Sequence, residues 1–448
     1  MDFSSLYAIS PIDGRYSSQT EPLLAYFSEY GLIRYRVQVE VKYFLALCRI
    51  PLPQLADFPI ENIPTLDKIY LSFTEEDAVR IKAIESTTNH DVKAVEYFLR
   101  EKWEKLGLDH YKEFIHFGLT SQDINNTAIP LSLKEGINDI IIPEMENILT
   151  QIKVKAAGWQ NIPMLARTHG QPASPTKLGK ELMVFAERLQ KQVNSLDGKK
   201  YFGKFGGATG NFNAHHVAYP EIKWMDFADD FLKIDLGIIR NKYTSQIDHY
   251  DDMADVFDNL RRINVILIDF CRDIWMYVSQ DYFRQAVKAS EVGSSAMPHK
   301  VNPIDFENAE GNLGLANAIL DHLSNKLPVS RLQRDLTDST VLRNMGVPIG
   351  HSLIAYNSIL KGISKLIVNE EKIHNDLEQN WAVVAEAIQT VLRREGYPHP
   401  FDKLKEFTRG KANLDKAVFE AFIDQLEVPE KLKLELKAIT PFNYTGIY

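Results

Sequence analysis

The chain has few cysteines, no long apolar run and no cluster of basic residues. Its two cysteines, Cys48 and Cys271, are too few and too far apart in sequence for a disulfide framework or a cysteine-based metal site. No segment reaches the roughly eighteen uninterrupted apolar residues that a membrane helix needs, and the opening residues lack the basic and apolar regions of a signal peptide. A net charge of -9 without a basic tail argues against nucleic-acid binding. We therefore expect a cytoplasmic protein with no membrane or nucleic-acid partner.

Glycine and proline are absent between Ile238 and Val292, and apolar residues recur there at steps of three and four. This spacing predicts one long amphipathic helix whose apolar face carries Met253, Val256, Phe257, Leu260, Ile263, Leu267, Phe270, Ile274 and Val278. The segment from Leu178 to Leu196 and the run from Asp305 to Leu320 show the same period. Strand signals are weak, because valine and isoleucine fall within the helical periods instead of alternating. The sequence predicts an all-α fold with a bundle of long helices.

The length of 448 residues suggests about three domains, and 45% hydrophobic residues are enough for a substantial core. We interpret Gly107 and Gly362 as interruptions of the helical pattern, and we place domain boundaries beside them. The expected domains are residues 1–110 (N-terminal, helical), 111–364 (central long-helix bundle) and 365–448 (C-terminal, helical). Helices this long expose more apolar surface than one chain usually covers, which favours self-association.

A segment of small residues, Gly293 to Ala296, precedes Lys300 and a proline-led helix. Small residues leave backbone N–H groups unshielded, and a lysine nearby adds positive charge, so the segment can close over an anion. Asn302 is expected to cap the following helix, with Pro303 at its first position. The plainer alternative is a surface loop rich in small residues.

The residues 293–303, GSSAMPHKVNP, resemble the signature loop of the fumarase, aspartase and argininosuccinate lyase superfamily. Five further segments resemble the bacterial adenylosuccinate lyase family within it: SPIDGRY, TTNHDVKAVEYF, RTHGQPASP, NPIDFENAEGNLGLANA and KLPVSRLQRDLTDSTVLRN. This resemblance implies three helical domains, a homotetramer with shared active sites and no cofactor. It also implies β-elimination of fumarate from two nucleotide substrates, adenylosuccinate (giving AMP) and the succinylated aminoimidazole carboxamide ribotide SAICAR (giving AICAR).

The resemblance also implies roles for single residues. Ser294 is the expected base, His169 the general acid and Glu307 the carboxylate that orients the histidine, while Lys300 supplies positive charge to the base. A histidine suits the acid because its ordinary pKa lies near neutrality. The substrate-binding positions implied in the same way are Arg15, Tyr16, Asn89, His90, Asp91, Thr120, Ser121, Gln246, Ser295, Lys300, Val301, Asn302, Asn308, Arg334, Ser339, Thr340, Val341, Leu342 and Arg343.

Structural alternatives stay open for several of these positions. Asn89 can cap a helix, and a helix cap explains the segment from Thr120 to Asp123 almost as well as substrate binding does. His169 can be a hydrogen-bonded structural residue. The glycine-rich segment from Gly203 to Gly210 fits neither a dinucleotide fingerprint nor a phosphate loop, so we interpret it as a structural turn. His215 and His216 lack the spacing of metal ligands, and we expect no metal.

Two other functions compete with the nucleotide lyase. Another fumarate-releasing lyase, such as argininosuccinate lyase or fumarase, is disfavoured by the Gly14-Arg15-Tyr16 segment and by the strip from Arg334 to Arg343. His299 disfavours fumarase in addition. A non-catalytic helical scaffold is disfavoured because the expected catalytic residues are all present.

Overall fold

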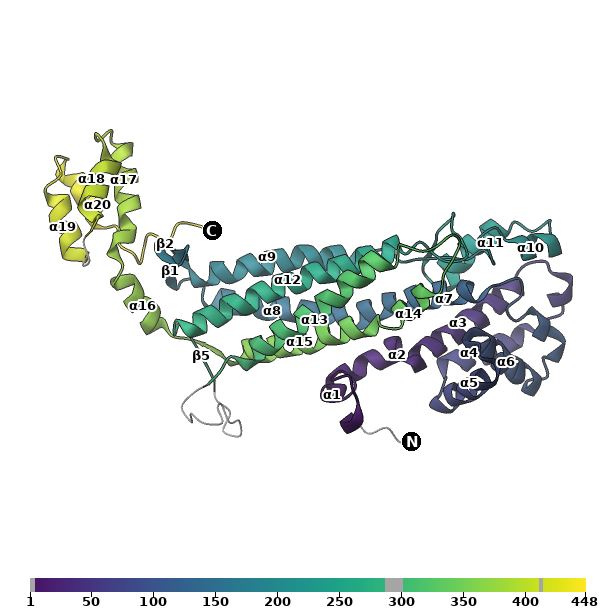
Figure 1. The fold of residues 1–448 in the computed structure, drawn as a ribbon. Coiled ribbons are helices and arrows are strands. Elements are labelled where there is room, and N and C mark those ends of the chain that lie inside the picture. The colour runs from purple at the N-terminus through teal and green to yellow at the C-terminus, as the bar shows by residue number, and fades with distance from the viewer. Residues whose placement is uncertain (1–4, 287–300, 411–413) are drawn as a thin grey trace. The chain divides into compact units, whose positions relative to one another are not determined.

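The computed structural model describes residues 5–286, 301–410 and 414–448, and these are mostly helical (Figure 1). The chain divides into two compact units. Unit 1 comprises Met1–Met145, Gln192–Val265 and Gly311–Asn357, and unit 2 comprises Glu146–Lys191, Ile266–Glu310 and Ser358–Tyr448. The all-α fold expected from the sequence is confirmed. Among the described residues, no helix is long and apolar enough to span a membrane. The three-domain division stays a prediction.

Five long helices contribute to both units, because the division between the units falls inside each of them. They are α8 (Ile142–Gly158), α9 (Leu178–Asp197), α12 (Asp251–Ser279), α13 (Ile304–Lys326) and α15 (Gly346–Lys365). The helices predicted over 178–196 and 253–278 are confirmed by α9 and α12. The third predicted helix is present as α13 and is longer than expected at its C-terminal end.

The start of α13 differs by one residue from the prediction. The helix begins at Ile304, and the carbonyl of Pro303 accepts hydrogen bonds from the amides of Phe306 and Glu307. The helix therefore begins one residue later than predicted, with Pro303 directly before its first residue instead of at its first position.

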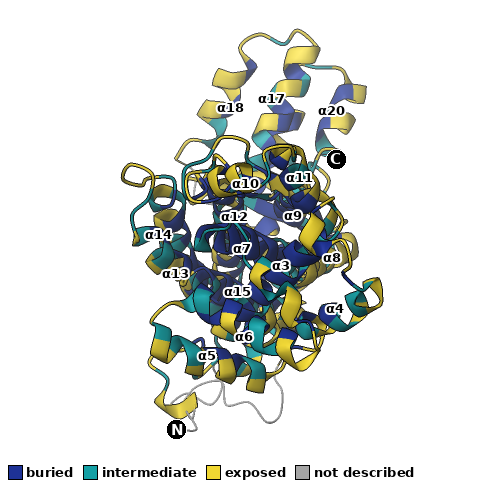
Figure 2. Ribbon diagram, turned by 90° about the vertical axis from the view of Figure 1, so that its right-hand side faces the viewer, coloured by how far each residue is buried: buried dark blue, intermediate teal, exposed yellow. Residues whose placement is uncertain are grey.

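Unit 1 also contains further helices of various lengths and one two-stranded parallel sheet. They are α1 (Ser17–Thr20), α2 (Leu24–Phe27), α3 (Glu29–Leu47), α4 (Ile63–Leu71), α5 (Glu75–Thr88), α6 (Asp91–Lys105), α7 (Ser121–Gly136), α10 (Asn213–Ala218), α11 (Trp224–Asp230), α14 (Thr337–Leu342), β3 (Phe202–Gly203) and β4 (Ile239–Arg240). Helical periodicity places Ile33, Val37 and Phe44 on one buried face of α3, which packs against α7. Most residues of α7 are buried, as the dark blue ribbon in Figure 2 shows. A π-helical turn, Ile137–Ile141, joins α7 directly to α8.

Unit 2 adds two antiparallel sheets and a helical C-terminal region. Its elements are β1 (Pro163–Thr168), β2 (Gln171–Lys177), β5 (Phe283–Gln285), β6 (Leu366–Val368), α16 (Glu370–Glu378), α17 (Ala385–Arg394), α18 (Pro400–Thr408), α19 (Lys416–Asp424) and α20 (Glu430–Lys437). A separate hydrophobic cluster that includes Trp381, Leu392, Phe419 and Leu436 holds the C-terminal helices together.

Two local expectations were wrong. The segment before α9 is a β-hairpin, although strand signals in the sequence are weak. Gly362 does not interrupt a helix, because it lies inside α15. A Cβ atom at Gly362 would lie 2.7 Å from the ring of Phe306, so the glycine permits close packing of α15 on this ring.

Candidate active site

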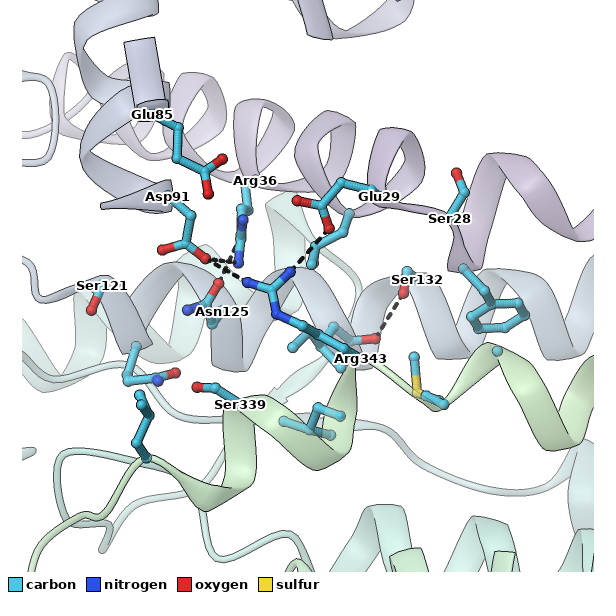
Figure 3. Close-up of a pocket in the computed structure, with 18 of the residues that line it drawn as sticks. Ser28, Glu29, Arg36, Glu85, Asp91, Ser121, Asn125, Ser132, Ser339 and Arg343 are labelled. Carbon is cyan, nitrogen blue, oxygen red and sulfur yellow. Dashed lines mark hydrogen bonds and ion pairs between the residues drawn. The ribbon is translucent and has the colours of Figure 1, made fainter. Parts of the chain in front are cut away.

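A cavity of about 450 Å³ lies within unit 1, a volume suited to a small organic ligand. Four segments form its walls: the start of α3, the junction of α5 and α6, the first turns of α7 and the segment from Arg334 to Gly346 (Figure 3). Eight of the residues predicted to bind substrate line it, namely Asn89, His90, Asp91, Ser121, Arg334, Ser339, Leu342 and Arg343. Segments far apart in the sequence therefore meet at one cavity.

The junction of α5 and α6 places three of these side chains. Asn89 ends α5 in the left-handed conformation, with φ 50°, and His90 caps α6 by accepting a hydrogen bond from the Lys93 amide at its Nδ1 atom (3.1 Å). The structural alternative of Asn89 as an N-terminal cap is therefore wrong, since His90 has that role. Asp91 follows as the first residue of α6.

Arg36, on α3, is a buried cation that sequence reasoning missed. Its side chain is 3% exposed, its Nε donates to Oδ1 of Asn125 (2.8 Å), and it forms an ion pair with Asp91 (2.7 Å). Burial raises the pKa of Asp91, but Arg36 and the Val92 amide more than offset burial, so this carboxyl has a pKa below its usual value. Helical spacing from Ile33 could have indicated that Arg36 lies on the buried face of α3, but nothing local to the helix indicates that it faces a cavity.

Arg343 lies between two carboxylates at the cavity wall. Its guanidinium contacts Oε2 of Glu29 at 3.0 Å and Oδ2 of Asp91 at 3.1 Å (Figure 3). Arg334 instead donates to neutral groups, the side-chain carbonyl of Gln246 (3.2 Å) and the hydroxyl of Ser339 (3.5 Å). The structure thus brings the predicted residue Gln246 into contact with a residue of the cavity wall. Glu29 was not predicted.

Buried hydrogen bonds fix the helix that carries Ser339 and Leu342. The hydroxyl of Tyr250 donates to Oδ2 of Asp338 on α14 (2.8 Å) and accepts from Nδ2 of Asn126 on α7 (2.7 Å). All three side chains are nearly inaccessible to solvent. They tie α14 to α7 and so set the position of the cavity wall.

The start of α7 combines a helix cap with a buried ion pair. Thr120 and Asp123 form a capping box, as the structural alternative expected, while Ser121 lines the cavity. Asp123 also pairs with Lys204 (2.8 Å) and accepts from the amides of Gly206 and Gly207. The glycine-rich segment is therefore a structural turn that is hydrogen-bonded to Asp123. A two-residue strand, β3, leads into this turn.

Other predicted residues of unit 1 do not line the cavity. Arg15 is exposed and lies over the ring of Tyr16, 5.9 Å from its centroid. Thr340 and Val341 are on α14 between residues that do line the cavity.

Ser294, Ser295 and Lys300 lie outside the described residues, as do His299 and most of the predicted anion-binding loop.

The remaining predicted residues belong to unit 2. His169 and Gly170 form the two-residue turn of the β1–β2 hairpin, with φ values of 52° and 73°. Positive φ at both positions is the pattern of a type I′ turn, whose first position is most often asparagine, aspartate or glycine. The turn leaves the imidazole exposed.

The hairpin is tied to α16, because Arg167 pairs with Asp376 (3.3 Å). Glu307 accepts a hydrogen bond from the indole N–H of Trp275 (3.0 Å), and Asn308 accepts one from Ser358 (2.9 Å). Val301 is exposed and Asn302 half-buried. The orienting role of Glu307 stays a prediction.

Comparison with known proteins gives matches along the chain. A family model described as lyase matches residues 14–318, and one described as adenylosuccinate lyase C-terminal matches residues 330–445. The chain is 56% identical to adenylosuccinate lyase of Dictyostelium discoideum and 53% identical to that of Escherichia coli (strain K12), in each case over 100% of this chain and 98% of the relative.

A solved structure shares the fold at low sequence identity. It is the 3-carboxy-cis,cis-muconate lactonizing enzyme from Pseudomonas putida, with a TM-score of 0.74 at 19% identity over 95% of this chain and 93% of that chain. At this identity the likeness concerns the fold alone.

Proposed function

The chain belongs to the adenylosuccinate lyase family, and on that basis we propose that it cleaves adenylosuccinate to AMP and fumarate, and SAICAR to AICAR and fumarate. The observation that carries this proposal is the similarity along the whole chain to relatives that bear this name, at more than half of all positions. A second match, to the family model specific to the C-terminal part of these enzymes, disfavours argininosuccinate lyase and fumarase.

The proposed reaction is an elimination without hydrolysis. A base removes a proton from the carbon next to a carboxylate, the C–N bond breaks, and an acid protonates the departing nitrogen. We assign the base to Ser294 and the acid to His169. Two features of His169 support this role. Its imidazole is exposed, so a substrate can reach it. Its backbone has a positive φ, a conformation that non-glycine residues often adopt at functional sites. Lys300 would stabilise the negative charge that develops on the substrate.

We assign the nucleotide end of the substrate to the cavity of unit 1. Arg334 supports this assignment, because its contacts with Gln246 and Ser339 leave its charge without a carboxylate partner among the described contacts. Guanidinium groups suit phosphate oxygens because they donate two parallel hydrogen bonds. Ser121 and Asn89 offer further polar groups from two other segments that line the cavity.

We further propose a homotetramer with shared active sites, acting in the cytoplasm. The long helices expose large apolar side chains, among them Val184, Val265, Trp275, Met276 and Leu315, and a shared bundle would cover such a surface. The two free cysteines, Cys48 and Cys271, fit a reducing compartment.

The test of the function is an ultraviolet assay of the purified protein with four compounds: adenylosuccinate, SAICAR, argininosuccinate and malate. We expect turnover of the first two alone. Turnover of argininosuccinate or malate in their place would identify another lyase of the superfamily, and no turnover of any compound by a folded protein would favour the scaffold.

Variants of the two arginines test the assignment of the nucleotide end. We expect Arg334→Ala to weaken AMP binding by about tenfold or more and to leave fumarate binding nearly unchanged, because a charged hydrogen bond contributes roughly 1.5–3 kcal/mol. Arg343→Ala should show the same preference with a smaller loss, since carboxylates already engage this arginine. Product-inhibition constants for AMP and fumarate measure both effects, and equal losses for the two products would contradict the assignment.

A further inference from the structure

The cavity wall carries as many carboxylates as guanidinium groups. Glu29, Glu85 and Asp91 face Arg36, Arg334 and Arg343 among the described lining residues. An anionic nucleotide therefore meets a wall whose formal charges cancel. Arg334 has no carboxylate partner among the described contacts, so any further attraction for an anion depends on whether Arg36 or Arg343 can be released from its carboxylate.

The two carboxylates that contact Arg343 differ in how firmly they are held. Asp91 is 24% exposed, pairs with the buried Arg36 and accepts the Val92 amide at its second oxygen (2.9 Å). Asp91 is thus fixed whether or not Arg343 contacts it.

Glu29 is 42% exposed and is the first residue of α3. Its other oxygen, Oε1, lies 3.2 Å from the ammonium of Lys82, on α5. The N-terminal end of a helix also favours a negative charge. Glu29 therefore keeps two favourable interactions when the guanidinium of Arg343 turns away, and Arg343 keeps Asp91.

We propose that Glu29 competes with the anionic group of the nucleotide for Arg343, and so limits how tightly the site binds nucleotides. Binding exchanges one ion pair for another: the guanidinium leaves the Glu29 carboxylate and takes a nucleotide oxygen. Both partners retain a second interaction, so the exchange is inexpensive, and product AMP is released more readily than from a site without Glu29. This inference rests on the proposed function, with the nucleotide in the unit 1 cavity.

The test is Glu29→Gln, which keeps the size of the side chain and removes its charge. We expect the inhibition constant of AMP against adenylosuccinate cleavage to fall about two- to fivefold, as for other ion pairs of this exposure. The inhibition constant of fumarate should not change. An unchanged or weaker affinity for AMP would overturn the proposal, since a residue that merely positions Arg343 would make AMP bind less tightly when removed.

Two matched variants separate this effect from others. Glu113→Gln removes one negative charge from an exposed pair with Arg100, away from the cavity, and should leave AMP binding unchanged. In the background of Arg343→Gln, Glu29→Gln should no longer tighten AMP binding, because the contested guanidinium is gone. A gain that persists there would mean that Glu29 acts by general repulsion and would contradict competition for Arg343. If the unaltered protein cleaves no adenylosuccinate, the proposed function fails, whereas an active protein with an unaffected Glu29→Gln variant refutes this inference alone.

Discussion

His215 is a buried histidine whose place depends on the glycine beside it. A Cβ atom at Gly118 would lie 2.8 Å from Nε2 of the imidazole, so a larger residue would displace the ring. The Nε2 atom lies 3.0 Å from the Tyr43 hydroxyl, which itself donates to the Phe117 carbonyl (2.7 Å). We infer that Nε2 carries the proton and donates to Tyr43, which leaves Nδ1 as a buried acceptor without a described partner. The neutral imidazole fits this site and the charged form does not.

Acid should therefore destabilise the protein through His215. Burial lowers its pKa to about 4, from an ordinary value of 6.5. Above pH 6.5 both the folded and the unfolded state are neutral at this position, and no effect arises. Between pH 6.5 and 4 the unfolded state binds a proton that the folded state does not, so stability falls, by about 3 kcal/mol in full.

The variant His215→Gln keeps a donor toward Tyr43 and does not titrate. We expect its urea midpoint to decline less steeply than that of the unaltered protein between pH 6.5 and 4.5. Parallel declines would show that other groups control the acid sensitivity.

Individual residues of the candidate site could be predicted from the sequence only where they lie within a family motif. The strip Asn89-His90-Asp91 and the arginines 334 and 343 were found by resemblance, and the structure places them at one cavity. Arg36 and Glu29 were missed, because nothing local to α3 indicates which buried or terminal charge faces a cavity. That information resides in α6 and in the segment after Arg334, which approach α3 only in the folded chain.

At the scale of elements, periodicity predicted the long helices and failed for the hairpin. The apolar steps in α9 and α12 continue over five turns or more, so the pattern outweighs local exceptions. In contrast, β2 contains Pro172 and Pro175, which argue against a strand. It forms because β1 pairs with it and packs against α16, a contact between residues more than 200 positions apart that sequence reading could not supply.

The anchoring of the 203–210 segment on α7 gives a prediction at this scale. Lys204 and Asp123 are both fully buried, and the ammonium also donates to the Gly207 carbonyl (2.6 Å). Lys204→Met keeps most of the volume but leaves the Asp123 carboxylate buried without its cation. Removing one partner of a buried pair costs about 3–5 kcal/mol, so we expect a loss of this size in urea denaturation.

The double variant Asp123→Asn with Lys204→Met controls for lost packing. It should be more stable than Lys204→Met alone, because no uncompensated charge remains. A single variant as stable as the unaltered protein would contradict the assigned importance of this pair.

At the scale of the whole molecule, the long helices present apolar surface that the described residues of one chain leave exposed. Trp275 is 42% exposed, Met276 48% and Leu315 56%, on α12 and α13. Side chains of this size are usually covered, and a second copy of the same helices is the partner that the superfamily resemblance implies. Residues expected to act in one reaction also belong to different units, with His90 in unit 1 and His169 in unit 2.

We predict that Ser294, His169 and His90 of one active site come from different subunits, as the superfamily resemblance implies, and the pair Ser294 and His169 offers the test. Each of the variants Ser294→Ala and His169→Ala should be inactive alone, because each lacks one of the two proton carriers that the elimination requires. When the two inactive proteins are mixed, dissociated and reassembled, some sites receive Ser294 from one parent and His169 from the other. Random association of equal amounts would make about a quarter of the sites fully wild type, so activity should recover toward about a quarter of the unaltered level.

Each variant taken alone through the same dissociation and reassembly is the control and should stay inactive. If mass spectrometry shows mixed oligomers and no activity returns, both residues must act from the same chain, because a mixture then never unites the two wild-type side chains in one site.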